Sequence, residues 1–89
     1  MKTFHKDPDA VLDYQIDWSD WLDTDTIADS TWTAPDDGIT MDSDEASTTA
    51  TVVWLSGGTA GDIYTLTNHI TTDGGREDDR SIQIVMTNK

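Results

Sequence analysis

The sequence contains no cysteine, which excludes disulfide bonds and cysteine-ligated metal sites. It also lacks any apolar run near the roughly 20 residues that a membrane-spanning helix needs, and its first ten residues lack the apolar stretch of a signal peptide. We therefore expect a soluble, unprocessed chain without a membrane partner. A chain of 89 residues forms one domain whose core is too small to enclose a large active site, so we expect function to lie on the surface.

Positive charge is scarce, and its placement is uneven. The formal net charge is −13 at pH 7, and residues 7–75 carry 15 acidic side chains without one lysine or arginine. The five basic residues lie towards the two ends: Lys2, Lys6, Arg76, Arg80 and Lys89. A body this negative repels phosphate backbones, so we expect no nucleic-acid partner. Two explanations of the charge stay open. The acidic loops keep the protein soluble, or the basic ends dock on acidic surface of neighbouring copies or partners.

Strong helix formers are also few, because aspartate (16) and threonine (15) are the commonest residues and both are mediocre helix formers. In the stretch LDYQIDW, residues 12–18, apolar and polar side chains alternate as in a strand, although Tyr14, Trp18 and Trp21 also fit one helical stripe. Strand-like segments in the rest of the chain favour the strand. We predict strands at residues 12–18, 27–33, 39–41, 48–55, 63–72 and 80–87.

Turn residues separate these segments, notably APDDG, SGGTAGD and DGGREDD, and we predict a polar loop at DSDEAS, residues 42–47. The pattern predicts an all-β fold, a small antiparallel β-sandwich of Ig-like type with six to seven strands and no helix longer than about two turns. Residues 1–10 are expected to form an N-terminal arm, and residues 11–89 the single sandwich domain. We place Trp32 and Trp54 in the core, and Trp21 on a turn where it caps the open end of the sandwich or faces outward.

No residue pattern indicates catalysis or metal binding. A calcium loop starting at Asp42 has Ser47 where glycine is needed and Val53 where a bidentate glutamate is needed, and a loop starting at Asp23 fails in the same way. There is no Gly-x-Ser-x-Gly elbow and no glycine-rich phosphate loop, and His69 falls on the threonine-rich face of its strand. We therefore expect no enzyme activity, no catalytic or metal-binding residues and no cofactor.

Three segments resemble a family of small tailed-phage and prophage virion proteins known as fiber-tail adaptors: KDPDAVLDYQIDWSDWL (6–22), DTIADSTWT (25–33) and WLSGGTAGDIYTLTNHITTDGGREDDRSIQI (54–84). The resemblance implies a structural component of the virion, assembled in the bacterial host cytoplasm, that links the tail or neck to fibers. Its partners would be other virion proteins of the tail, neck, fibers or capsid, and it would be a homo-oligomer in the particle. A capsid decoration protein is the first alternative, and a small glycan- or ligand-binding module is the second.

The charge map also predicts how such a protein would be held in its assembly. Acidic bodies packed face to face repel each other, and basic ends placed against a neighbour's acidic surface relieve that repulsion. An arm can in addition add a strand to a neighbour's sheet. We therefore predict contacts through the arm and the 74–80 loop, with one aromatic anchor; the residues are Lys2, Phe4, Lys6, Trp21, Arg76 and Arg80.

Overall fold

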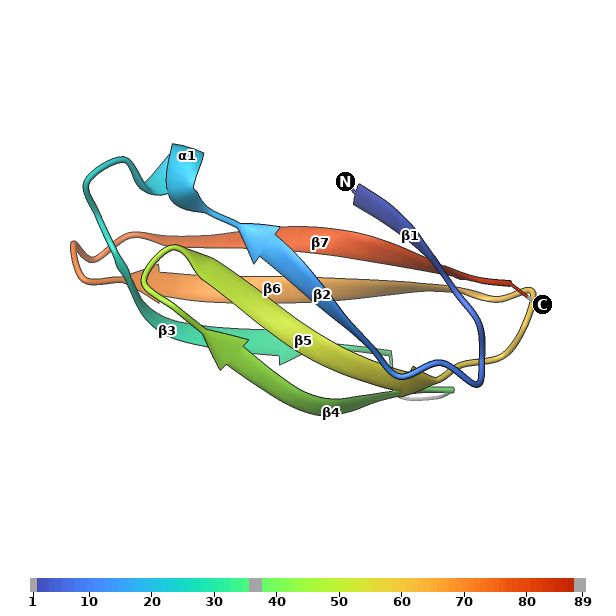
Figure 1. The fold of residues 1–89 in the computed structure, drawn as a ribbon. Helices are drawn as coiled ribbons and strands as arrows, with labels where there is room; N and C mark the ends of the chain where they lie inside the picture. The colour runs from blue at the N-terminus through green and yellow to red at the C-terminus, as the bar shows by residue number, and fades with distance from the viewer. Residues whose placement is uncertain (1, 36–37, 88–89) are drawn as a thin grey trace.

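Strands dominate the computed structural model, which describes residues 2–35 and 38–87. The strands are β1 (Lys2–Lys6), β2 (Leu12–Asp17), β3 (Ile27–Thr33), β4 (Ile39–Ala46), β5 (Ala50–Gly57), β6 (Ile63–Thr72) and β7 (Glu77–Met86), and helix α1 spans Ser19–Leu22. The seven strands form two sheets, with strand orders β1-β7-β6-β3 and β2-β5-β4. The sheets lie as two layers in Figure 1. The predicted all-β sandwich is confirmed. Within the described ranges, no helix is long and apolar enough to cross a membrane.

The core lies between the two sheets because the strands alternate between buried and exposed side chains. On β6, Tyr64, Leu66 and Ile70 are buried, while Thr65 and Thr67 between them face outward. Strand β7 repeats this alternation and pairs with β6 in an antiparallel register. The period of two residues that predicted these strands therefore also predicted which of their faces is buried.

The N-terminal segment departs from the prediction of a free arm, because residues 2–6 form β1 and pair in parallel with β7. Phe4 lies opposite Ile84 in that register and stacks on Tyr14 with ring centroids 4.9 Å apart. At the end of the strand, Lys6 is buried, and its Nζ donates to the carbonyl oxygen of Gly57 at 2.7 Å. Packing of the partly buried Phe4 against the core and pairing with β7 thus hold the segment in the sandwich.

The tryptophans are distributed differently from the prediction. Trp32 is buried as expected, but the largest fully buried side chain is Trp18, at the end of β2. Trp54 is only half-buried, because Val53 and Leu55 on either side of it face the core, and the side chain between them must point to the outer face of the sheet. The prediction that Trp54 is a core residue is therefore wrong; β5 carries apolar residues on both faces, so composition alone did not show which face is inside.

Two polar segments predicted as loops belong to strands. The stretch DSDEAS was expected to be a loop, but residues 42–46 continue β4, which pairs with β5 through a register shift between Met41 and Ser43. All side chains of β4 after Ile39 are exposed, as in an edge strand. The hairpin loop is also shorter than predicted, since β7 begins at Glu77 and places Arg80 within the strand. Parts of the predicted arm, turn and basic C-terminus lie outside the described residues: Met1, Asp36, Asp37, Asn88 and Lys89.

Candidate protein-contact surfaces

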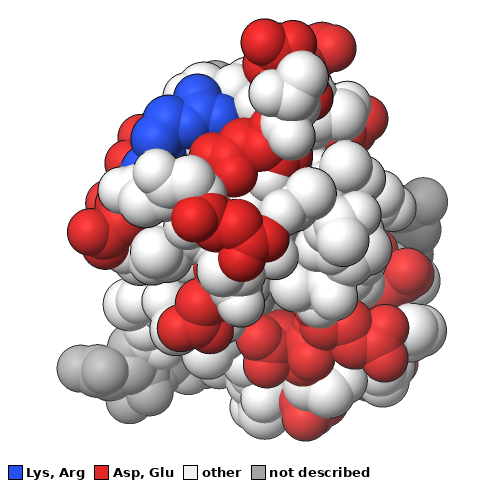
Figure 2. All heavy atoms as spheres, turned by 90° about the vertical axis from the view of Figure 1, so that its left-hand side faces the viewer, with Lys and Arg blue, Asp and Glu red and all other residues white. Residues whose placement is uncertain are grey.

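Two tryptophans and two arginines are stacked where β2 passes into α1. The single helical turn brings Trp18 and Trp21 edge to face, with ring centroids 5.5 Å apart and planes at 69°. The guanidinium carbon of Arg80 lies 4.4 Å from the centroid of Trp18, and that of Arg76 lies 4.4 Å from the centroid of Trp21. Each arginine therefore makes a cation–π contact inside its own chain. Figure 2 shows this end of the molecule, where basic side chains form one small patch among carboxylates.

Arg76 is held by further contacts that tie the 73–76 loop to the end of α1. Its Nη2 donates to the carbonyl oxygen of Leu22 at 2.8 Å, a favourable place for a cation because helix C-termini expose carbonyl groups. Its Nε donates to Oδ2 of Asp25 at 3.2 Å. A hydrogen bond from the Thr72 side chain, with others from backbone N–H groups and Arg76, holds the pKa of Asp25 at about 2.

Three of the basic residues predicted as contacts, Lys6, Arg76 and Arg80, make contacts within their own chain. Besides its stacking on Trp18, Arg80 donates from Nη1 to the carbonyl oxygen of Asp17 at 3.2 Å. Lys6 is buried with its ammonium group on backbone carbonyls, and burial lowers the pKa of its ammonium group. These three cations thus stabilise their own chain, and the prediction that basic residues contact a neighbour stays a prediction.

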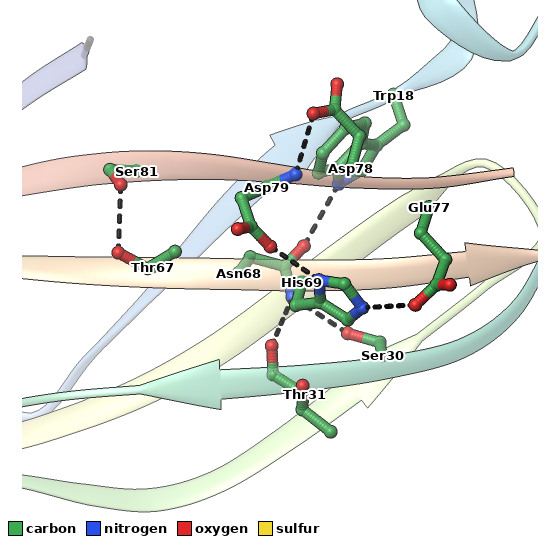
Figure 3. Close-up of polar contacts among 10 residues, drawn as sticks. All are labelled: Trp18, Ser30, Thr31, Thr67, Asn68, His69, Glu77, Asp78, Asp79 and Ser81. Atoms are coloured by element: carbon green, nitrogen blue, oxygen red, sulfur yellow. Dashed lines mark hydrogen bonds and ion pairs between the residues drawn. The ribbon is translucent and has the colours of Figure 1, made fainter.

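A buried polar network beneath Trp18 was not predicted from the sequence. Asn68 is completely buried on β6; its Oδ1 accepts from Trp18 Nε1 at 3.0 Å and from Thr51 Oγ1 at 2.7 Å. Its Nδ2 donates to Ser30 Oγ at 2.9 Å and to the carbonyl oxygen of Thr31 at 3.0 Å. Figure 3 shows how one amide joins β2 to β6 and β3 across the sandwich. Because its hydrogen-bonding groups are satisfied, Asn68 can be buried without a net penalty.

Part of the outer face of the four-stranded sheet carries no charged side chain. Thr33, Thr67 and Ser81 lie side by side on β3, β6 and β7, and Thr67 Oγ1 is 2.9 Å from Ser81 Oγ. The next row along the sheet is equally uncharged and consists of Thr65, Gln83 and Thr3. We call these two rows the hydroxyl face. In a chain of net charge −13, it is a surface on which another acidic protein meets few carboxylates.

Beyond the hydroxyl face, His69 lies between two carboxylates. Its Nε2 is 3.0 Å from Oε1 of Glu77, and its Nδ1 contacts Oδ1 of Asp79, as Figure 3 shows. Hydrogen bonds to Asp79 and then to Glu77 raise the pKa of His69. The expected surface position of His69 is thus confirmed, and the histidine neutralises acidic side chains at the start of β7 when it is protonated.

A groove with a volume of about 400 Å³ opens between the edges of the two sheets, close to the first residue of β1. Its lining comes from three strands: Lys2, Gln15, Ile16, Asp17, Arg80, Ser81 and Ile82. Of the predicted contact residues, the structure brings Lys2 and Arg80 together here. Arg76 instead lines a second, more open hollow beside Asp25, whereas Phe4 and Trp21 pack against the core.

The fold and these surfaces define a small acidic β-sandwich that carries a groove, two arginines stacked on tryptophans and an uncharged hydroxyl face. The sequence matches the family described as "Podophage GP4 fiber-tail adaptor protein gp77" over residues 6–85. The chain belongs to this family, which gives it a structural role at the tail and fibers of a phage particle and other virion proteins as partners. No curated protein matches the chain.

Proposed function

We propose that this protein is a non-enzymatic adaptor that joins the fibers of a podophage to the tail or neck of the particle through protein–protein contacts alone. The family match over residues 6–85 is the observation that carries the proposal. The site is consistent with it, because the groove and the hydroxyl face are surfaces suited to binding a protein segment or a sheet. The adaptor works without a cofactor and is assembled into the virion in the cytoplasm of the bacterial host.

The copy number of the protein in purified particles tests this function. An adaptor at one tail follows the symmetry of that tail, so we expect about a dozen copies or fewer, measured on a quantitative gel against a capsid protein of known copy number. Hundreds of copies would instead indicate a capsid decoration protein. Absence from particles would contradict both functions. The glycan-binding alternative requires that sugars quench the fluorescence of the partly exposed Trp21.

We also propose that the sandwich is of the Ig-like type. The sheets β2-β5-β4 and β7-β6-β3 have the order that Ig domains give to strands BED and GFC. Trp32 is buried on β3, the equivalent of strand C. Tyr64 near the start of β6 accepts a hydrogen bond from the Thr59 N–H at 3.1 Å, as in a tyrosine corner. Two residues later, the fully buried Leu66 stands where antibody domains carry a cysteine.

We propose that the protein forms a homo-oligomer in the particle. Lys6, Arg76 and Arg80 make contacts within their own chain. They are therefore less available to offset the electrostatic repulsion between two acidic copies. We propose that copies meet through the hydroxyl face, where few carboxylates oppose each other. Light scattering at physiological salt should report an oligomer for the original protein and a monomer for Thr67→Glu. A monomer for both, or the same oligomer for both, contradicts this surface.

A further inference from the structure

Strand β7 is paired along only half of one edge. β1 covers Ile82 to Met86, whereas β7 begins at Glu77, and among the described residues no strand pairs with Glu77–Ser81 on that side. In Figure 1, the chain enters β1 midway along β7, so the half of β7 towards α1 has no part of β1 beside it. We call Glu77–Ser81 the open edge. An unpaired edge presents backbone groups that can bind another strand.

The backbone groups of the open edge point the right way for pairing. In a strand, successive residues send their N–H groups to opposite sides. The Thr87 N–H donates to Lys6 in β1, and the Met86 N–H donates to Asp62 on the other side, so odd-numbered residues of β7 face the β1 side. The N–H of Asp79 therefore points to the open edge, and it donates to Oδ1 of the adjacent Asp78 at 2.8 Å. A partner strand could replace the Asp78 carboxylate as the acceptor for the Asp79 N–H.

The groove lies beside the open edge and can accept a side chain of such a strand. Ile16 from β2 and Ile82 from β7 give it an apolar lining, and Ile82 is the residue at which the pairing with β1 starts. Because side chains of a strand alternate, a segment added in line with β1 would direct every second side chain towards these residues. The volume of about 400 Å³ is ample for one aliphatic side chain.

The charges around the open edge select the partner. The open edge and the groove carry four carboxylates, those of Asp17, Glu77, Asp78 and Asp79, against the two cations Lys2 and Arg80, and the net charge of the chain is −13. These carboxylates repel the acidic strands of a second copy, which is how edge charges prevent self-pairing, and they favour a segment of opposite charge. We propose that the open edge receives an extended, cationic segment of a partner virion protein, which adds a strand in line with β1 and inserts an apolar side chain into the groove. This inference rests on the proposed adaptor function and names the chemistry of its partner.

Hydrogen exchange with a synthetic peptide tests the inference. The probe is a peptide of about seven residues with alternating lysine and valine, long enough to add a strand. At saturating peptide, exchange of the Asp79 amide should slow by about tenfold or more, with chemical-shift changes at Ile16 and Ile82. Two control peptides separate pairing from charge: the same peptide with a central proline, which cannot pair as a strand, and an alternating glutamate–valine peptide. Equal effects of the lysine peptide and its proline version, or no effect of either, overturn the inference.

Variants of the protein make the test specific to the edge. Asp79→Pro removes the outward N–H, a change that edge strands tolerate, and Asp79→Asn is the matched control that keeps it. We expect Asp79→Pro to weaken peptide binding at least tenfold and Asp79→Asn to weaken it far less. Lys2→Trp fills the groove without altering β7, so it should also reduce binding. If all three variants fold and bind the peptide as the original does, the open edge is not the binding site.

Particles separate this inference from the proposed function. If Asp79→Pro protein enters particles and retains fibers as the original does, the open edge carries no partner, while the adaptor function stands. If the original protein is absent from particles, the adaptor function fails, and the peptide experiment still decides whether the edge binds an extended cationic segment. The two results are therefore independent of each other.

Discussion

At the scale of single residues, Asn68 connects the two layers of the sandwich. An inward position could be predicted for it from the sequence, because it is in phase with Tyr64, Leu66 and Ile70 on an alternating strand. Its partners could not, since Trp18 and Thr51 belong to the opposite sheet, 50 and 17 residues away in the chain. Local periodicity predicts which face of the sheet a side chain lies on, but it does not predict which residues that side chain contacts.

Asn68→Ala should destabilise the protein strongly. The change removes the acceptor of the Thr51 hydroxyl and leaves Trp18 Nε1 only its longer hydrogen bond, to Thr51 Oγ1 at 3.3 Å, and an unsatisfied buried group costs about 1–3 kcal/mol. We expect a loss of about 2–4 kcal/mol in the free energy of unfolding, measured by urea denaturation. Thr65→Ala on the outer face of the same strand is the control and should change it by about 0.5 kcal/mol or less. Equal losses in both variants would show that the network contributes little.

Arg80→Lys tests whether the guanidinium acts by its shape or by its charge. Lysine keeps the charge near Asp17 but cannot stack its planar group on Trp18. Cation–π contacts at partly exposed sites contribute about 0.5–1 kcal/mol, so we expect a loss of that size in urea denaturation. Gln83→Ala, on the outer face of the same strand, is the control for general effects at β7. If the lysine variant is as stable as the original, the stabilisation by Arg80 comes from its charge alone.

Asp25 gives the protein a specific sensitivity to acid. Its pKa is about 2 in the folded chain against an ordinary value of 3.8, so it contributes stability that is fully present above about pH 4 and is lost as the pH falls through about 2. In thermal denaturation between pH 5 and pH 2, the melting temperature of Asp25→Asn should therefore fall less steeply than that of the original. Asp13→Asn, on the other sheet, should follow the original curve; identical slopes for all three would contradict this role.

At the scale of elements, sequence patterning succeeded for strands that have one polar face and failed elsewhere. Alternation identified β6 and β7, because threonine or polar residues separate most of their buried apolar ones. It misassigned Trp54, since Val52 and Trp54 are apolar on the outer face of β5. It also missed β1, whose partner β7 lies at the other end of the chain. A parallel pairing between the two ends leaves no local turn signal in the sequence.

The different exposure of neighbouring side chains on β1 predicts different effects for two adjacent residues. Phe4 packs against the core and His5 is exposed, so Phe4→Ala should lower the free energy of unfolding by about 1–3 kcal/mol, and His5→Ala should change it by about 0.5 kcal/mol or less. Urea denaturation of both variants measures the contrast. A free arm requires that neither change matters, and that result would reject the pairing of β1 with β7.

At the scale of the whole molecule, the sequence predicts how much charge the chain carries, but it does not predict what the charged side chains contact. The excess of carboxylates and the ends on which the cations lie follow directly from residue counts. That Arg76 and Arg80 contact Trp21, Trp18 and backbone carbonyls follows only from the fold. The ion pairs among the described residues involve only three carboxylates, Asp25, Glu77 and Asp79. Most of the negative charge is therefore compensated by solvent ions rather than by the protein.

The unpaired charge makes stability depend on salt. The molecule measures 42 × 19 × 17 Å, and the screening length falls from about 30 Å at 0.01 M salt to about 3 Å at 1 M, so repulsion between carboxylates acts across the whole sandwich at low salt and only between neighbours at high salt. The melting temperature should therefore rise as sodium chloride is increased over this range. A variant with Asp42→Asn, Asp44→Asn and Glu45→Gln, all exposed on β4, should melt higher than the original at low salt and gain less from added salt. A melting temperature that does not change with salt, or that falls, would show that self-repulsion is not what limits the stability of this protein.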